Sequence, residues 1–261
     1  MAILIMLHSY KIMLSSTAQA NNVWWIYNQQ ENYNNQLINW RILLLHYFRY
    51  RWWKYTVDSH KYGNYKHQEQ ILINDLIHAL NKESSKMKKF LADHLRITYK
   101  KMWKQGNKNI DENSPLPPED EINRIVHEIW VGNKNFEERQ DDNTGKISDK
   151  IKRIVNDEHF SLEQKKTEIE KALTSYYNMN HRLLRTETIH IINQSNMDCM
   201  KHGGIDRVMW ITAEDERVCV HCRPRDHKVY PIDLVPPYPD HPNCRCVLIG
   251  VSKLVTKSEI H

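Results

Sequence analysis

The sequence predicts an α+β fold that is mostly helical, with a helical N-terminal region followed by a C-terminal domain of helices and a small sheet. Glycine is scarce, with seven residues in a chain of 261, which favours helices. Apolar residues recur at helical steps between residues 68 and 104, at Leu72, Leu76, Leu80, Met87, Leu91, Leu95 and Met102. Short strands are predicted near the C-terminus, at 208–212, 229–232 and 247–251.

Residues 1–105 are predicted to form a basic, aromatic-rich helical region. Its first part, 23–58, has apolar side chains clustered as in a buried helix, and 59–66, which contains Gly63, is the expected break before the amphipathic helix of 68–104. Residues 106–118 have the composition of a linker, with three prolines among polar residues. We therefore place a domain boundary there.

Residues 119–261 are predicted to form the second domain. Its first helix follows Pro118 and has acidic residues in its first turn, where they favour the positive end of the helix dipole. Gly145 is expected in a turn, before a short helix over 147–155. Ser161 and Gln164 have the spacing of a capping box for a helix that reaches about Tyr177. A separate helix is expected from about 180 to 200, ended by Gly203-Gly204.

The charge is unevenly distributed along the chain. Residues 1–110 hold sixteen basic and six acidic residues, whereas the remainder holds 21 basic and 26 acidic. A basic segment attracts phosphate backbones without sequence preference, and aromatic rings among the cations can stack on bases. The preferred interpretation is an amphipathic helix whose rings pack on a neighbour while its cations stay solvated. The candidates for nucleic-acid or partner contact are Arg49, Arg51, Trp52, Trp53, Lys54, Lys88 and Lys89.

Two cysteine pairs carry the strongest chemical signal in the chain. Cys219-Val-His-Cys222 and Cys244-Arg-Cys246 flank a stretch that contains six prolines. Zinc takes four such ligands tetrahedrally, with Zn–S near ~2.3 Å. Because 215–247 has few large apolar residues, we predict a loop held shut by Zn²⁺. The predicted ligands are Cys219, Cys222, Cys244 and Cys246, with His241 as an alternative ligand.

Disulfides or free thiols remain open as alternatives for these cysteines. The chain has five cysteines, and Cys199 is the odd one. An oxidised secreted scaffold uses cysteine more freely and more evenly, and the spacings CxxC and CxC suit metals better than structural bridges.

An ordered set of motifs gives a family resemblance. Each motif alone is weak, but the order is specific: Arg185-Thr-Glu-Thr188, Gly203-Gly204, Trp210-Ile-Thr-Ala213, Asp215-Glu-Arg217 leading into the first cysteine pair, Pro236-Pro237, and His241-Pro-Asn-Cys-Arg-Cys246. This order resembles the MuF-type minor head proteins of tailed bacteriophages, the phage head morphogenesis family. The resemblance covers about residues 180–250, and residues 1 to about 115 show none.

The resemblance implies a structural minor capsid protein that acts in head assembly. It implies the portal protein and other capsid proteins as partners, and the virion as the location after assembly in the host cytoplasm. The basic N-terminal half adds packaged phage DNA, bound without sequence preference, as a candidate contact. Relatives often place a glycine in the turn after CxxC, whereas this chain has Arg225-Asp226-His227-Lys228. Aspartate and histidine tolerate left-handed backbone better than most residues.

A structural charge network is expected around the motifs, made of Arg185, Glu187, Asp215 and Arg217. We expect Arg185 to make a bidentate pair with Asp215, and Arg217 to pair with Glu187. The alternative is an ADP-ribosyltransferase-like toxin effector, because Glu214-Asp-Glu216 has an ExE pattern with Arg185 upstream. The Ser-Thr-Ser strand that such an enzyme needs is missing.

A zinc-containing nuclease is the second enzymatic alternative. It would need a general-base histidine and a further metal near phosphate. The residues available for those roles are His221, Asp226, His227, Asp240 and Asn243. Since no nuclease motif is complete, we assign no catalytic residue and expect a protein that is not an enzyme.

The extreme N-terminus is largely apolar from Met1 to Leu14, and Ala18-Gln19-Ala20 resembles a signal-peptidase site. However, the basic start is missing and polar residues interrupt the apolar run, so no signal peptide is expected. No stretch of about twenty apolar residues predicts a membrane span. A reducing cytosol would keep the thiols available for a metal.

Overall fold

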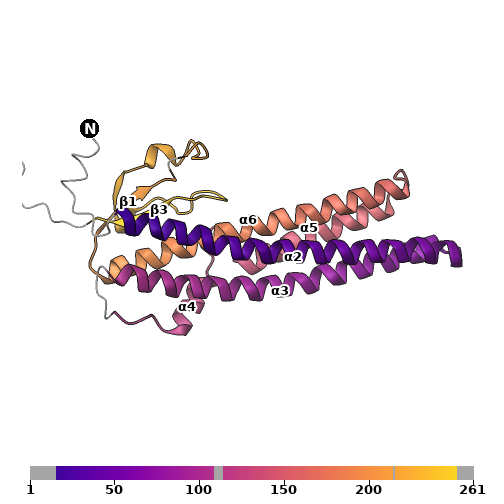
Figure 1. Ribbon diagram of the computed structural model, residues 1–261, viewed down its shortest axis with the longest axis horizontal. Coiled ribbons are helices and arrows are strands. Elements are labelled where there is room, and N and C mark those ends of the chain that lie inside the picture. The colour runs from indigo at the N-terminus through magenta and orange to yellow at the C-terminus, as the bar shows by residue number, and fades with distance from the viewer. Residues whose placement is uncertain (1–15, 109–113, 214, 252–261) are drawn as a thin grey trace, which may run out of the picture. The chain divides into compact units, whose positions relative to one another are not determined.

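The computed structural model describes residues 16–108, 114–213 and 215–251, with the backbone alone for 16–34. The prediction for the apolar residues 1–14 therefore lies outside the described residues. The described helices are α2 (Ser16–Tyr62), α3 (Tyr65–Asn107), α4 (Glu119–Val126), α5 (Phe136–Asn156) and α6 (Leu162–His202). The strands are β1 (Arg207–Ile211), β2 (Val229–Pro231) and β3 (Val247–Gly250). Figure 1 labels the five helices and the strands β1 and β3. The predicted mostly helical α+β fold is confirmed.

The chain divides into two compact units, each built from separate stretches. One unit contains residues 29–92 and 127–184, and the other contains 1–28, 93–126 and 185–261. The long helices α3 and α6 contribute residues to both units. The proline-rich stretch 106–118 lies inside the second stretch of the latter unit. We call the first the helical unit and the second the sheet unit.

The helical unit is a bundle formed by parts of α2, α3, α5 and α6. Trp40 on α2 meets Phe90 on α3 edge to face, with ring centroids 5.2 Å apart. On α5, the side chain of Thr144 donates to Ser84 on α3 over 3.0 Å. The Tyr176 hydroxyl on α6 accepts from Gln140 on α5 over 3.1 Å. Apolar side chains fill the interior, and these buried polar pairs find partners within it.

Glycines lie at the ends of α2 and α6, as the sequence predicts. Gly63 has φ +68°, and its N–H donates to Ser59 O over 3.0 Å between α2 and α3. Gly204 has φ +73°, and the following N–H of Ile205 reaches back to Met200 O over 2.9 Å. Such left-handed caps satisfy carbonyls at the end of a helix. The predicted break at 59–66 and the end of the helix at Gly203-Gly204 are confirmed.

Two predicted helix boundaries are wrong. Gly145 does not form a turn, because α5 runs through it from Phe136 to Asn156. The helices expected on either side of 177–180 are one continuous helix, α6. Packing explains the continuity, since Asn180 is buried and its side-chain oxygen accepts from Asn143 on α5 over 3.1 Å. The capping box that starts α6 is confirmed by reciprocal bonds between Ser161 and Gln164.

The sheet has the order β2-β1-β3 with both pairs antiparallel. The three predicted strands are confirmed to within a residue or two. Trp210 in β1 is fully buried, in a core that also includes Met197 and Met200 of α6 and Leu248 of β3. Among the described helices, none has an apolar stretch of the length that crossing a membrane requires.

Candidate metal centre

Strand register brings the two cysteine pairs to one edge of the sheet. Ile211, the last residue of β1, lies opposite Val247, the first residue of β3. The chain therefore leaves β1 beside the point where it enters β3. Cys219 and Cys222 follow β1 in the chain, and Cys246 directly precedes β3. The backbone pairing thus places the segments that carry the two pairs next to each other where they leave and enter the sheet.

A tight turn adds His241 to the same place. The N–H of Cys244 donates to His241 O over 3.1 Å, and Asn243 adopts a left-handed φ of +61° within that turn. Asparagine tolerates this backbone conformation better than most residues. The turn holds the imidazole on the side of the first cysteine pair.

Five donor atoms gather in two overlapping groups. The Nε2 atom of His241 lies 3.1 Å from Cys219 Sγ and 3.3 Å from Cys222 Sγ. Cys222 Sγ is 3.8 Å from Cys244 Sγ. Within each group all ligand atoms lie within 4.8 Å of one another, and Cys222 belongs to both; the groups are Cys219–Cys222–His241 and Cys222–Cys244–Cys246. The four predicted cysteines therefore come close enough to hold a metal ion.

Hydrogen bonds around the donors prepare them to bind a cation. His241 Nδ1 is 3.0 Å from Pro242 O. Because a carbonyl only accepts, Nδ1 carries the proton and Nε2 keeps its lone pair for a metal. The backbone N–H of Cys222 donates to Cys219 Sγ over 3.3 Å. Burial opposes ionisation of Cys219, but this N–H and that of His221 lower its pKa overall.

The other three thiols, Cys222, Cys244 and Cys246, shift one another's pKa values. A hydrogen bond from the Cys246 thiol lowers the pKa of Cys244 to about 5. The same hydrogen bond, together with burial, raises the pKa of Cys246. Burial, followed by the charge of Cys244, raises the pKa of Cys222 to about 12. Without a cation, further thiolates are unfavourable beside Cys244, and a divalent ion would remove that repulsion.

The space among the donors suits a single ion. A cavity of about 20 Å³ lies between the cysteine pairs and is lined by all five donors. One water molecule or ion fills a space of this order, and an organic cofactor does not fit. The residues present thus fit a metal ion on both chemistry and size.

Side chains from the other motifs clamp this centre. The N–H of Asn243 donates to Thr186 Oγ1 on α6 over 3.2 Å. Arg245, between the second pair of cysteines, donates through both terminal nitrogens to the carboxylate of Asp215. These two contacts join the Arg-Thr-Glu, Asp-Glu-Arg and Cys-Arg-Cys motifs around one cluster.

Residues 143–249 match the family model described as Phage Mu protein F like protein. The match covers under half of the chain and includes α6 from its first residue, the sheet and both cysteine pairs. The resemblance seen in the motifs is confirmed for this C-terminal part. Neither a curated protein nor a solved structure matches the chain.

The charge pairs of the Mu F-like segment differ from the expected ones. Asp215 pairs with Arg245 rather than with Arg185, because Arg245 reaches the carboxylate from inside the Cys-Arg-Cys motif. The hydrogen bonds from Arg245 hold the pKa of Asp215 at about 2. Arg217 lies 3.5 Å from Glu216, with both side chains exposed, and its backbone N–H donates to Asp215. Glu187 is buried on α6.

Sequence reasoning missed Asn193, which is fully buried on α6. Its amide nitrogen donates to Cys246 O over 3.1 Å, and its amide oxygen accepts from Leu248 N over 3.0 Å. The residue thereby ties the start of β3 to α6 directly behind the second cysteine pair. The available signal was a polar residue directly after the apolar pair Ile191-Ile192, since a buried amide requires partners.

The turn after the first cysteine pair forms without glycine. His227 takes the left-handed position, with φ +59°, and its N–H donates to Trp210 O over 2.8 Å. Asp226 accepts from Thr212 N over 2.8 Å, and Asp240 pairs with Arg225 at 3.1 Å. Residues considered for a nuclease site therefore make structural contacts, and the metal groups found among the described residues contain only cysteines and His241. For the ADP-ribosyltransferase pattern, Glu214 lies outside the described residues.

The candidate contact residues on α2 and α3 fall into two groups. Arg49 pairs with Glu170 at 2.9 Å, Arg51 with Asp75, and Lys88 with Asp141 at 2.8 Å. Trp52 is buried, whereas Trp53, Lys54 and Lys89 are exposed. Internal carboxylates therefore neutralise three of the five candidate cations, which reduces the charge available to a phosphate backbone.

Proposed function

We propose that this chain is a structural head morphogenesis protein, a minor capsid component of a tailed bacteriophage, and not an enzyme. The observation that carries the proposal is the family match at 143–249, together with the convergence of the motifs on the cysteine cluster. In this role the sheet unit serves as a rigid module, and the chain meets the portal and other capsid proteins in the virion after assembly in the host cytoplasm.

The metal that the cluster holds is, in this proposal, zinc. Thiolate and imidazole donors in a closed site suit Zn²⁺, and its tetrahedral geometry places sulfur ligands about 3.8 Å apart. The Cys222–Cys244 sulfur separation of 3.8 Å supports this assignment. With five donors available, His241 can replace one cysteine of the four, and its position against Cys219 and Cys222 supports that alternative.

Zinc would act here by folding the segment. The stretch 212–246 has no long helix or strand, and its described order consists of turns, two short 3-10 helices and β2. Such loops gain their order from metal binding, so the binding energy is folding energy. The four cysteines, His241 and the clamps from Thr186, Asp215 and Asn193 would form one cooperative structure.

The experiment that tests this function separates assembly from catalysis. The purified chain is mixed with the portal ring of the same phage and examined by size-exclusion chromatography, and separately incubated with plasmid DNA and Mg²⁺. We expect the chain to co-elute with the portal ring and the plasmid to remain intact. Cleavage that disappears in the Cys219→Ser variant would instead assign a zinc-containing nuclease, and failure to co-elute would contradict the portal as partner.

A further inference from the structure

An apolar stripe lies on the side of α2 that faces away from the helical bundle. Its side chains are large and exposed, and we call them the outer face of α2: Ile38, Ile42, Leu43, Tyr47, Tyr50, Trp53 and Val57. Trp53 is 61% exposed and Leu43 is 63% exposed. Apart from the adjacent pair Ile42 and Leu43, successive positions are three or four residues apart, so the row occupies one half of the helix surface. The opposite side, with Leu44, Phe48, Trp52 and Tyr55, is buried.

Two apolar faces on one helix require explanation. A surface helix of a soluble domain normally has one apolar stripe, and its other side is polar. Scattered exposed apolar residues are normal, but a contiguous row of this kind marks an interaction surface. The inner face of α2 already serves the bundle, so the outer face is available for a partner.

The charged residues that α2 itself contributes along this row have a single sign. Between Asn35 and Val57 the sequence has four basic residues, Arg41, Arg49, Arg51 and Lys54, and no acidic residue. Arg49 and Arg51 pair internally, whereas Lys54 is exposed on the outer side. A complementary partner surface is therefore acidic.

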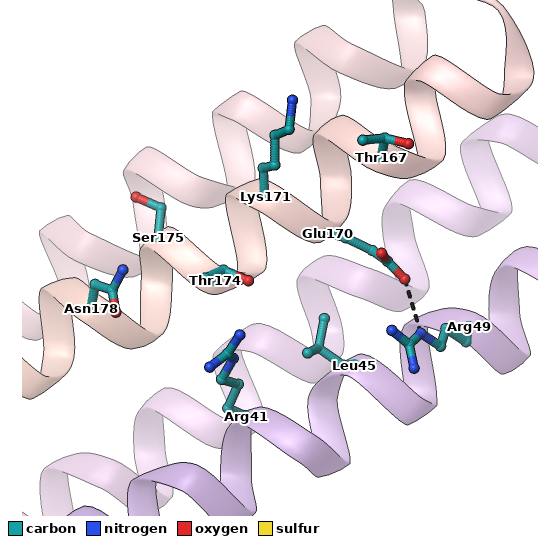
Figure 2. A pocket seen from close by; sticks show the side chains of 9 residues that line it. All are labelled: Arg41, Leu45, Arg49, Thr167, Glu170, Lys171, Thr174, Ser175 and Asn178. Atoms are coloured by element: carbon teal, nitrogen blue, oxygen red, sulfur yellow. Dashed lines mark hydrogen bonds and ion pairs between the residues drawn. The ribbon is translucent and has the colours of Figure 1, made fainter.

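A polar groove runs along one border of the row. Figure 2 shows Arg41, Leu45 and Arg49 of α2 opposite residues of α6, in a cavity of about 430 Å³ within the helical unit. The Arg41 guanidinium lies over the Tyr177 ring, 5.5 Å from its centroid. Its Nε atom is buried and has no hydrogen-bond partner among the described residues. A carboxylate entering the groove would satisfy this donor.

We infer that the outer face of α2 and the adjoining groove dock an acidic amphipathic helix of another protein. The apolar stripe of that helix would cover Ile42, Trp53 and their neighbours, and its bordering carboxylates would meet Arg41 and Lys54. This inference rests on the proposed assembly role and deepens it by giving the chemistry of the partner surface.

Two other occupants fit the same observations less well. A nucleic acid could stack on Tyr50 and Trp53, but Ile38, Ile42, Leu43 and Val57 offer no stacking surface. A second copy packed through the same face would add its own Arg41 and Lys54 to those of the first chain, and like charges at one interface are unfavourable. The acidic helix satisfies both the apolar row and the charges.

The test uses the full chain and a designed helical peptide that has leucine on one face and glutamate along its borders. Binding is measured by fluorescence anisotropy, beside a peptide with lysine in place of glutamate and a labelled oligothymidine. We expect the glutamate peptide to bind and the lysine peptide not to bind. The Ile42→Ala/Trp53→Ala double variant should weaken binding at least about tenfold, and Arg41→Gln should weaken it and flatten its salt dependence.

Ile129→Ala is the matched control, because Ile129 is 55% exposed outside α2 and Ile42 is 45% exposed. It should bind the glutamate peptide as the unchanged chain does. Equal or stronger binding of the lysine peptide, displacement of the glutamate peptide by oligothymidine, or no binding of the glutamate peptide would overturn the inference. Self-association that the double variant abolishes would also overturn it and assign the face to a second copy. Loss of peptide binding leaves the metal content of the sheet unit unaffected, so the two proposals fail separately.

Discussion

Single side chains decide how the cysteine-containing loop attaches to α6. Asn193 uses both ends of its amide to hold the backbone on either side of Val247. No charge, motif or spacing marks this role in the sequence. The clustering of the four cysteines, in contrast, could be predicted from the sequence because the spacings CxxC and CxC are typical of metal ligands. The partner of Asp215 could not be named, since Arg185, Arg217 and Arg245 are all suitable cations and only the folded loop selects Arg245.

Asn193→Ala should destabilise the sheet unit by about 2–4 kcal/mol, because it leaves the buried carbonyl of Cys246 and the N–H of Leu248 without partners. Urea unfolding followed by near-UV circular dichroism measures this loss. Asn196→Ala is the matched control on the same helix, since Asn196 is only partly buried. Equal effects of the two substitutions would count against the clamp.

Cys219→Ser should remove a ligand and destabilise the sheet unit by about 3 kcal/mol or more, while the bundle keeps its helicity. Hydrogen exchange should accelerate over 207–250. Cys199→Ser is the control, because Cys199 is buried against Asn107, with Sγ 3.1 Å from Oδ1, away from the metal groups. A Cys219→Ser chain that keeps both its metal and its melting temperature would exclude this cysteine as a ligand.

For helices and strands, apolar periodicity and capping residues predict the bounds correctly where tertiary packing favours the same bounds. The strands, the capping box at Ser161 and the end of α6 follow from local chemistry. The errors at Gly145 and at 177–180 share one cause. Local signals favoured breaks, but contacts between α5 and α6, such as that of Asn143 with Asn180, hold both helices straight through.

Alanine substitution should stabilise the chain at one glycine and destabilise it at another. A Cβ at either Gly145 or Gly204 meets no atom within 4 Å, so sterics do not distinguish them. Gly145 lies inside α5, where alanine should stabilise by about 0.5–1 kcal/mol. Gly204 has φ +73°, where alanine should destabilise by about 1 kcal/mol. Thermal unfolding of both variants checks this, and a destabilised Gly145→Ala chain would contradict the helix through that position.

For the whole molecule, the sequence predicted the helical N-terminal region and the approach of the two cysteine pairs, but not the arrangement into two units. The linker composition of 106–118 suggested a boundary in the chain, whereas α3 and α6 each supply residues to both units. Composition does not indicate that one helix contributes to two units, because its amphipathic pattern is the same in either unit. The sequence of the outer face of α2 is recognisably basic and rich in aromatic residues. Only the structure, however, distinguishes the buried Trp52 from the exposed Trp53.

Acidification should release the metal and unfold the sheet unit before the bundle. Thiolate and neutral imidazole bind the ion, so protons compete for the same atoms and the metal affinity falls with pH. Between neutral pH and about pH 4, a metal-sensitive dye should report release together with loss of near-UV signal, and a chelator at neutral pH should reproduce both changes. Release of the ion with no change in the sheet unit would contradict a folding role for the metal.

Elemental analysis and X-ray absorption at the zinc edge, both on the purified chain, test most directly whether the cysteine cluster binds zinc. We expect one zinc ion per chain, bound by sulfur at about 2.3 Å with at most one nitrogen ligand. A chain that is fully folded without any metal, or that has its four clustered cysteines joined in disulfides, would contradict it.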